Sequence, residues 1–200
     1  MDPCNQFFDG AEMVVLYLDM GLEGGEVQVA LPQSYLEDRA DQQSGLRHGS
    51  LLLRMMVGSA LPVSREQARR LTATQSAAHL TLLIGDFADL EKVIANLTAA
   101  AVPARNAVTR TPSDFGLSRL FAGDGDQSTL IYTAVNPSGE LSAVLECRAA
   151  AGKSNQSCTH YFRTHAIDAV VDYASKLLPQ WLQIQTQIDR FLSCATNGFE

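Results

Sequence analysis

Polar and hydrophobic residues alternate along much of this chain with a period of two, which is the pattern of a half-buried strand. The alternation is clearest in Glu26–Leu31 (EVQVAL), and the β-branched and aromatic segment Glu12–Met20 (EMVVLYLDM) precedes it. A glycine-containing turn at residues 21–25 separates the two segments, so they are predicted to form a β-hairpin. Pro32 ends the second strand, because proline cannot donate a ladder hydrogen bond.

Two further strands are predicted in the middle of the chain, at Ser50–Val57 (SLLLRMMV) and Ala78–Gly85 (AHLTLLIG). The first has few polar breaks, which predicts burial on both of its faces. The polar, glycine-containing segment Arg39–Gly49 is predicted to be a loop, long enough to be mobile or functional. A second loop is predicted at Pro103–Phe115.

Two helices are predicted between these strands and the last third of the chain. Ser64 and Gln67 fit a capping box, with Ser64 as the N-cap, and the short helix that they begin is predicted to end near Leu71. The second helix, Asp89–Ala101, has its apolar residues on one stripe. This stripe consists of Leu90, Val93, Ile94 and Leu97.

The last third of the chain is a run of short strands followed by one long helix. The strands are predicted at residues 117–122, 129–135, 141–148, 157–163 and 167–173. The helix is predicted over Leu178–Cys194, with Pro179 in its first turn and an apolar stripe of Trp181, Ile184, Ile188, Phe191 and Leu192.

Adjacent strand pairs of this kind favour an α+β fold with mostly antiparallel sheets of hairpins, and with two or three helices packed on one face. Residues 1–200 are predicted to form a single domain, with a weak subdivision near 103–114.

The charge of the chain is acidic and unevenly distributed. The formal net charge is −7, which does not fit nucleic-acid binding because a phosphate-binding protein needs a basic face. Residues 1–41 contain nine acidic residues and one basic residue. This segment is either a solvated edge that aids solubility or a surface that attracts a basic partner. On the second interpretation, the binding surface consists of this segment and the neighbouring polar loop Arg39–Gly49, and the predicted partner-binding residues are Glu37, Asp38, Asp41, Arg47 and His48.

The four cysteines do not have the C-x-x-C spacing of a zinc site. Cys147 and Cys158 flank the turn at 149–156, so a hairpin would place them opposite one another, and a disulfide is predicted. The alternative is a pair of small buried residues in a reducing cytosol. Cys4 and Cys194 could form a second disulfide, and the sequence leaves this pairing open.

No motif for catalysis or cofactor binding is complete. The four histidines lack the HExxH spacing of a zinc protease, and the G-x-S-x-G motif of a serine hydrolase is absent. His165 and Asp168 could belong to a catalytic triad, but no serine lies in a recognisable nucleophile motif. Asp124-Gly125-Asp126 lacks the later calcium ligands, and Gly152-Lys153-Ser154 lacks the upstream glycine of a P-loop. We therefore predict no enzyme activity, no cofactor and no metal. His160 is expected on a sheet face, and His165 in a turn.

The longest apolar runs are too short to cross a bilayer, so stable membrane insertion is not predicted. The first residues, Met1-Asp2-Pro3-Cys4, also lack the basic and apolar regions of a signal peptide. Trp181, Tyr161 and Phe162 are expected to form a core cluster, with a ligand pocket as the alternative.

The segment Cys158–Leu192 resembles the C-terminal block of small envelope proteins of Gram-negative bacteria. The similarity consists of a cysteine before the aromatic strand Thr159–Phe162, a further strand, and the pattern Leu-Pro-x-Trp-x-x-Ile at Leu178–Ile184. A second similar block is Ala30–Leu36, followed by Ser50–Met55. Such proteins resemble immunity partners of antibacterial effectors, for example those of type VI secretion.

The resemblance implies a non-catalytic, periplasmic protein that binds and neutralises a cognate effector toxin. It leaves open whether the protein is free or anchored through a segment outside this sequence, and a cytoplasmic location is the alternative. A different function stays open on the residues alone, namely an envelope ligand-binding module with a pocket near Trp181.

Overall fold

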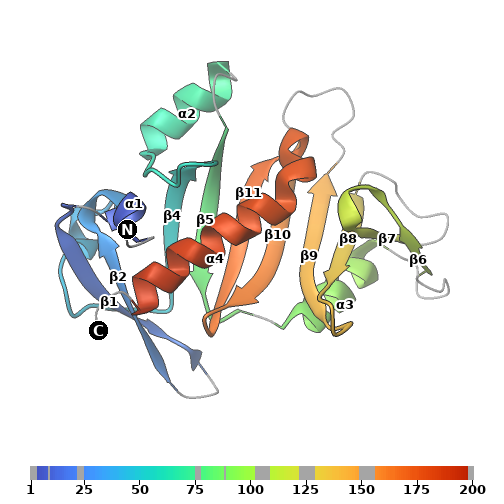
Figure 1. Cartoon of the computed structure of the whole chain (residues 1–200), viewed down its shortest axis with the longest axis horizontal. Coiled ribbons are helices and arrows are strands. Elements are labelled where there is room, and N and C mark those ends of the chain that lie inside the picture. Colours follow the sequence, from blue (N-terminus) through green and yellow to red (C-terminus); the bar gives the residue numbers. More distant parts are fainter. Residues whose placement is uncertain are drawn as a thin grey trace.

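The computed structural model describes residues 4–8, 10–21, 25–74, 78–87, 89–101, 109–121, 129–148 and 156–197 (Figure 1). The Asp124–Asp126 and Gly152–Ser154 segments lie outside these ranges. Within them the chain forms two sheets and four α-helices, with short 3₁₀ turns between them. The predicted α+β class with mostly antiparallel sheets is confirmed.

The smaller sheet has three strands in the order β2-β1-β3. β1 (Met13–Asp19) and β2 (Glu26–Pro32) pair antiparallel, which confirms the predicted hairpin. β3 (Arg47–His48) pairs parallel with β1 and lies inside the predicted loop 39–49. A strand of two residues is too short to show a period, and the sequence therefore did not indicate it.

The larger sheet has eight strands, and each pairs antiparallel with its neighbours. In order across the sheet they are β4 (Ser50–Met56), β5 (His79–Gly85), β11 (Ile167–Ala174), β10 (Ser157–Thr164), β9 (Leu141–Arg148), β8 (Thr129–Val135), β7 (Ser118–Phe121) and β6 (Thr109–Pro112).

Two sequence predictions for parts of this sheet were wrong. β6 lies inside the segment 103–115 that was predicted as a loop, and all four of its residues are exposed, so it has no apolar alternation. β4 is not buried on both faces. Leu51, Leu53 and Met55 are buried, but Leu52 between them is exposed.

The helices are α1 (Asn5–Phe8), α2 (Arg65–Thr74), α3 (Leu90–Ala101) and α4 (Trp181–Asn197). The capping box of α2 is confirmed, because Gln67 N donates to Ser64 Oγ (3.2 Å) and Ser64 N donates to the Gln67 side chain (2.9 Å). α2 continues three residues past the predicted end at Leu71. Pro179 lies in the 3₁₀ turn η5 (Ser175–Gln180), and α4 begins only after it.

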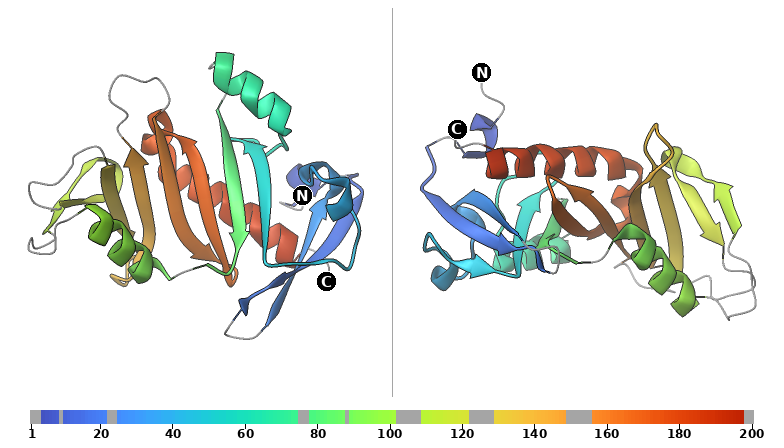
Figure 2. Two further views of the ribbon diagram at one scale, coloured as in Figure 1. Left: turned by 180° about the vertical axis from the view of Figure 1, so that it is seen from behind. Right: turned by 90° about the horizontal axis from the view of Figure 1, so that it is seen from below.

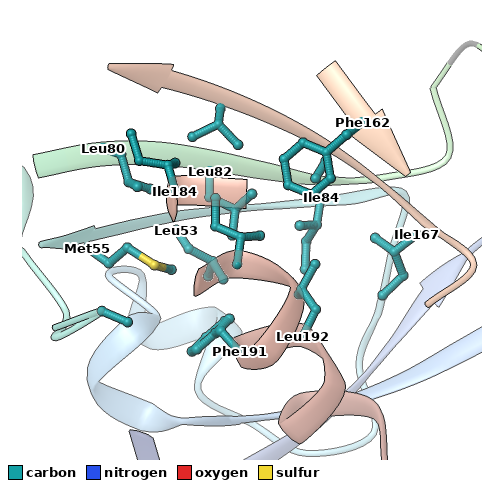
Figure 3. Close-up of a cluster of buried hydrophobic side chains, with 14 of the residues drawn as sticks. Leu53, Met55, Leu80, Leu82, Ile84, Phe162, Ile167, Ile184, Phe191 and Leu192 are labelled. Atoms are coloured by element: carbon teal, nitrogen blue, oxygen red, sulfur yellow. The ribbon is translucent and has the colours of Figure 1, made fainter. Parts of the chain in front are cut away.

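The main core lies between α4 and one face of the eight-stranded sheet (Figure 3). The predicted stripe of Trp181, Ile184, Ile188, Phe191 and Leu192 is buried there, against alternate residues of β4, β5, β11 and β10. α3 packs on the opposite face, where its apolar stripe contacts a second cluster around Val144 of β9. The helices therefore differ from the predicted arrangement, because α3 and α4 cover opposite faces (Figure 2).

Both cysteine pairs are bonded. Cys147 and Cys158 lie directly opposite one another in β9 and β10 and form the predicted disulfide. Cys4 is bonded to Cys194, which attaches α1 to the C-terminal half of α4 and brings the two ends of the chain together (Figure 1). Phe7 and Phe8 of α1 contact Phe191 of α4, with ring centroids 5.7 and 5.8 Å apart.

Candidate partner-binding surface

Glu37 follows the 3₁₀ turn η2 (Gln33–Tyr35) and joins three elements. Its carboxylate accepts a hydrogen bond from the Arg54 guanidinium of β4 and another from Arg65 N at the start of α2. Arg65 Nε also lies 3.8 Å from the same carboxylate. Glu37 therefore has a structural role in this surface, beside any role in binding.

Asp38 and Asp41 lie at the two ends of the 3₁₀ turn η3 (Arg39–Asp41). Asp38 is its N-cap, and its Oδ1 accepts from Ala40 N (2.9 Å). Asp41 Oδ1 lies 3.9 Å from His48 Nε2, so the turn meets β3 at this point.

Arg47 and Glu26 form a two-pronged ion pair on the outer face of the three-stranded sheet. Arg47 Nε and Nη2 both donate to the Glu26 carboxylate, the second at 3.2 Å. The hydrogen bond from Arg47 lowers the pKa of Glu26. The Arg47 guanidinium also lies over the Tyr17 ring, 5.8 Å from its centroid. Arginine and tyrosine are both enriched among the hot-spot residues of protein interfaces.

The segment 39–49 is held in place by hydrogen bonds to β1. Ser44 Oγ accepts from Val15 N (3.0 Å), Gly45 N donates to Val15 O (2.8 Å), and Leu46 O accepts from Tyr17 N (2.9 Å). The predicted loop is therefore a bonded 3₁₀ turn and an edge strand, and it presents its charged side chains in a fixed arrangement.

The five predicted residues thus fall into two groups. Glu37 and Asp38 adjoin α2 and β4, whereas Arg47 and His48 adjoin β1, and the contact between Asp41 and His48 links the groups. Three further acidic residues of the N-terminal segment, Asp2, Asp9 and Glu23, lie outside the described residues. Sequence reasoning did not find Tyr17, Glu26 or Arg54, because their contacts come from distant parts of the chain.

His165 and His160 both contact residues of α4. His165 lies in the β10–β11 turn, as predicted, and its Nε2 is 3.4 Å from Asp189 of α4. Asp168 pairs with Arg163 (3.4 Å) rather than with His165. Among the residues that the structure describes, no group of three or more metal-binding side chains could hold a metal ion.

His160 lies on the sheet face under α4, as predicted, and is fully buried. Its Nε2 is 3.2 Å from Gln185 Oε1, and its ring contacts Phe162, Tyr173 and Trp181. Burial lowers the pKa of His160 to about 3. Trp181 belongs to the same cluster, and its Nε1 donates to Phe115 O (2.9 Å), so its polar group is satisfied within the protein.

The low pKa of His160 predicts a loss of stability in mild acid. In the unfolded chain His160 takes up a proton near pH 6.5, whereas in the folded protein it does so only near pH 3. The free energy of unfolding therefore falls as the pH drops below 6.5. Between pH 7 and pH 5 the free energy of unfolding should fall by about 2 kcal/mol from this residue. Urea melts at the two pH values measure it. His160→Gln should weaken this dependence, and an unchanged pH dependence would contradict the assignment.

Comparison with known proteins finds similarity in fold but not in sequence. No family model matches the chain, and no curated protein matches it. Among solved structures it is similar to Smlt3025, an immunity protein of the Stenotrophomonas maltophilia type IV secretion system, with a TM-score of 0.62 and 13% identity. That match covers 91% of this chain and 93% of the other.

A second similar structure is FrpD, an iron-regulated outer membrane lipoprotein of Neisseria meningitidis, with a TM-score of 0.52 and 11% identity over 92% of this chain and 93% of that one. At these identities the comparisons establish a shared fold. An immunity-protein-like fold is thus confirmed, whereas type VI secretion is not supported, since Smlt3025 belongs to a type IV system.

Proposed function

We propose that this protein is an immunity protein that binds and neutralises a cognate antibacterial effector, and that it does so without catalysis. The observation that carries the proposal is the similarity to Smlt3025 over nearly the full length of both chains. The two blocks of sequence that resemble immunity partners of effectors support it independently.

The fold is suited to this role. Neutralisation needs a rigid body with one complementary surface. Two disulfides cross-link the chain, and hydrogen bonds from segment 39–49 to β1 hold the charged side chains of this surface in place. Preformed charge also accelerates capture, because complementary potentials steer diffusional encounter.

We further propose that the protein acts in the periplasm. Disulfides persist in oxidising compartments such as this one, and the second similar structure is a lipoprotein of the outer membrane. In the described parts of the chain, no helix is long and apolar enough to span a bilayer.

If acidic side chains steer the capture, reversing Asp38 and Asp41 to lysine should slow association with the effector about tenfold at low salt, and less at high salt, where the charges are screened. Dissociation should change little if these residues lie at the rim of the interface. Stopped-flow or surface-plasmon measurements with the effector candidate encoded beside this chain's gene provide the test. Glu37 is left unchanged, because its ion pairs with Arg54 and Arg65 hold the surface together.

The matched control reverses Glu91 and Asp114, two exposed acidic residues at the α3 and β7 end of the sheet. This pair changes the net charge by the same amount. If both pairs of substitutions slow association equally, the association rate depends on the total charge of the chain and not on the predicted surface.

A further inference from the structure

The face of the eight-stranded sheet that lies opposite α4 is only half covered. α3 packs over β9, with Tyr161 of β10 at the edge of that contact. Seen from behind, β4, β5 and β11 have no described helix over them (Figure 2). We call this uncovered part the open face. It is formed by the residues of β4, β5 and β11 that alternate with the buried ones, and by the neighbouring residues of β10.

Apolar side chains form a row across the open face. Strand register places Leu52, Leu83, Val170 and Tyr161 opposite one another on β4, β5, β11 and β10, and residues in register lie on the same face. Leu52 is 46% exposed, and the other three are half-buried. The solvated face of an antiparallel sheet is usually polar, so an apolar row on an uncovered face is a candidate interaction site.

An exposed aromatic ring adjoins this row. Phe87 is 40% exposed, and its Cζ lies 3.0 Å from the place where a side chain of Gly85 would begin. Gly85 follows Leu83 by two residues in β5 and therefore faces the same side. The absence of a side chain at Gly85 lets the Phe87 ring lie against the end of the open face and extend its apolar area.

A charged row runs beside the apolar one. Register places Arg54, Thr81, Asp172 and Thr159 opposite one another on the same four strands. Arg54 is neutralised by Glu37. Asp172 is exposed and accepts a hydrogen bond from Thr159 Oγ1 (2.6 Å), but no basic side chain in the described ranges forms an ion pair with it. The open face therefore offers one unpaired carboxylate next to an apolar strip.

α3 shows what kind of surface fits such a face. The apolar row continues from Tyr161 to Val144 of β9, and there the stripe of α3 covers it. Leu90, Val93, Ile94 and Leu97 supply the apolar side chains of that contact. A partner that covered β4, β5 and β11 would extend the layer that α3 begins.

The open face also joins the candidate partner-binding surface. Arg54 lies in the charged row, and its partner Glu37 belongs to the predicted surface. One binding partner could therefore contact both without a gap.

We propose that the effector docks on the open face, with apolar side chains over Leu52, Leu83 and Val170 and a basic side chain paired with Asp172. This inference rests on the proposed function and names the surface that performs it. The basic side chain is the complement of the unpaired carboxylate and of the net charge of −7. Leu52 and Asp172 are exposed, so a partner can reach these two side chains directly.

The test compares variants for binding to the purified, inactivated effector candidate encoded beside this chain's gene, by isothermal titration calorimetry. Leu52→Asp and Asp172→Arg should each raise Kd by about tenfold or more. Asp172→Asn should weaken binding less than Asp172→Arg, because it removes the attraction without adding repulsion. The control is Leu182→Asp, which introduces the same charge at a side chain 56% exposed on α4, and it should bind like wild type.

The outcomes separate the two proposals. If wild type binds the effector and the open-face variants bind it equally well with unchanged melting curves, the proposed docking on the open face is wrong and the proposed immunity function stands. If wild type does not bind, both fail. If Leu52→Asp instead converts a wild-type dimer to a monomer in light scattering while effector binding is unchanged, the face is a self-interface, and this inference is overturned.

Discussion

Trp181→Ala is expected to lower the free energy of unfolding by about 3–5 kcal/mol, the range found for large aromatic side chains removed from a core. Trp181 is only 7% exposed and lies in the main core, against His160 of the sheet. The substitution leaves a cavity between α4 and the sheet, and it also removes the hydrogen bond that satisfies Phe115 O. Urea or guanidinium melts followed by circular dichroism measure the loss.

The neighbouring residue provides the matched control. Leu182 is 56% exposed on the same helix, so Leu182→Ala should change the free energy of unfolding by less than about 0.5 kcal/mol. A loss below about 1 kcal/mol for Trp181→Ala would contradict its place in the core, and would leave the indole available for the ligand pocket considered from the sequence.

Replacing both Cys4 and Cys194 by serine is expected to have an effect of similar size. The disulfide joins residues 190 positions apart, and the chain-entropy model gives about 5 kcal/mol for a loop of this length, as an upper value. The substitution also frees α1, whose Phe7 and Phe8 pack on Phe191. The measurement is a denaturant melt under non-reducing conditions.

The second disulfide is the internal comparison. Its loop of 11 residues gives about 3 kcal/mol in the same model, so replacing Cys147 and Cys158 should cost less. Thiol titration of the unfolded, non-reduced wild-type protein should find no free cysteine. Two free thiols would show that one of the two disulfides is not formed. Four free thiols would show that neither is formed, and the disulfides would then no longer support a periplasmic location.

The strands that were predicted well share a physical reason. β1, β5 and β10 bury alternate residues, so burial imposes a period of two on their sequences. β8 and β9 bury residues on both faces, and such strands are found as short apolar runs between turns. α4 was found for the same reason, because its stripe of Trp181, Ile184, Ile188 and Phe191 must face the core. β3 and β6 were missed because a short or wholly exposed strand has no buried face to leave a pattern.

The candidate surfaces were less predictable than the core. The acidic charge of the first 41 residues pointed to Glu37, and the polar loop Arg39–Gly49 pointed to Arg47, but the contacts of these residues with Arg54 and Tyr17 are set by packing. The open face could not be predicted at all. Its apolar row combines four segments between Leu52 and Val170, and only the register of the sheet brings them together.

The most direct test of effector neutralisation is co-expression of this chain with the effector candidate encoded beside its gene, directed to the periplasm of a sensitive host. Cell survival and the recovery of a complex of the two purified proteins are measured together. We expect wild type to restore growth and to form a stoichiometric complex, and Asp172→Arg to reduce both. Normal killing by the effector in the presence of the folded wild-type chain, with no complex, would contradict the immunity function.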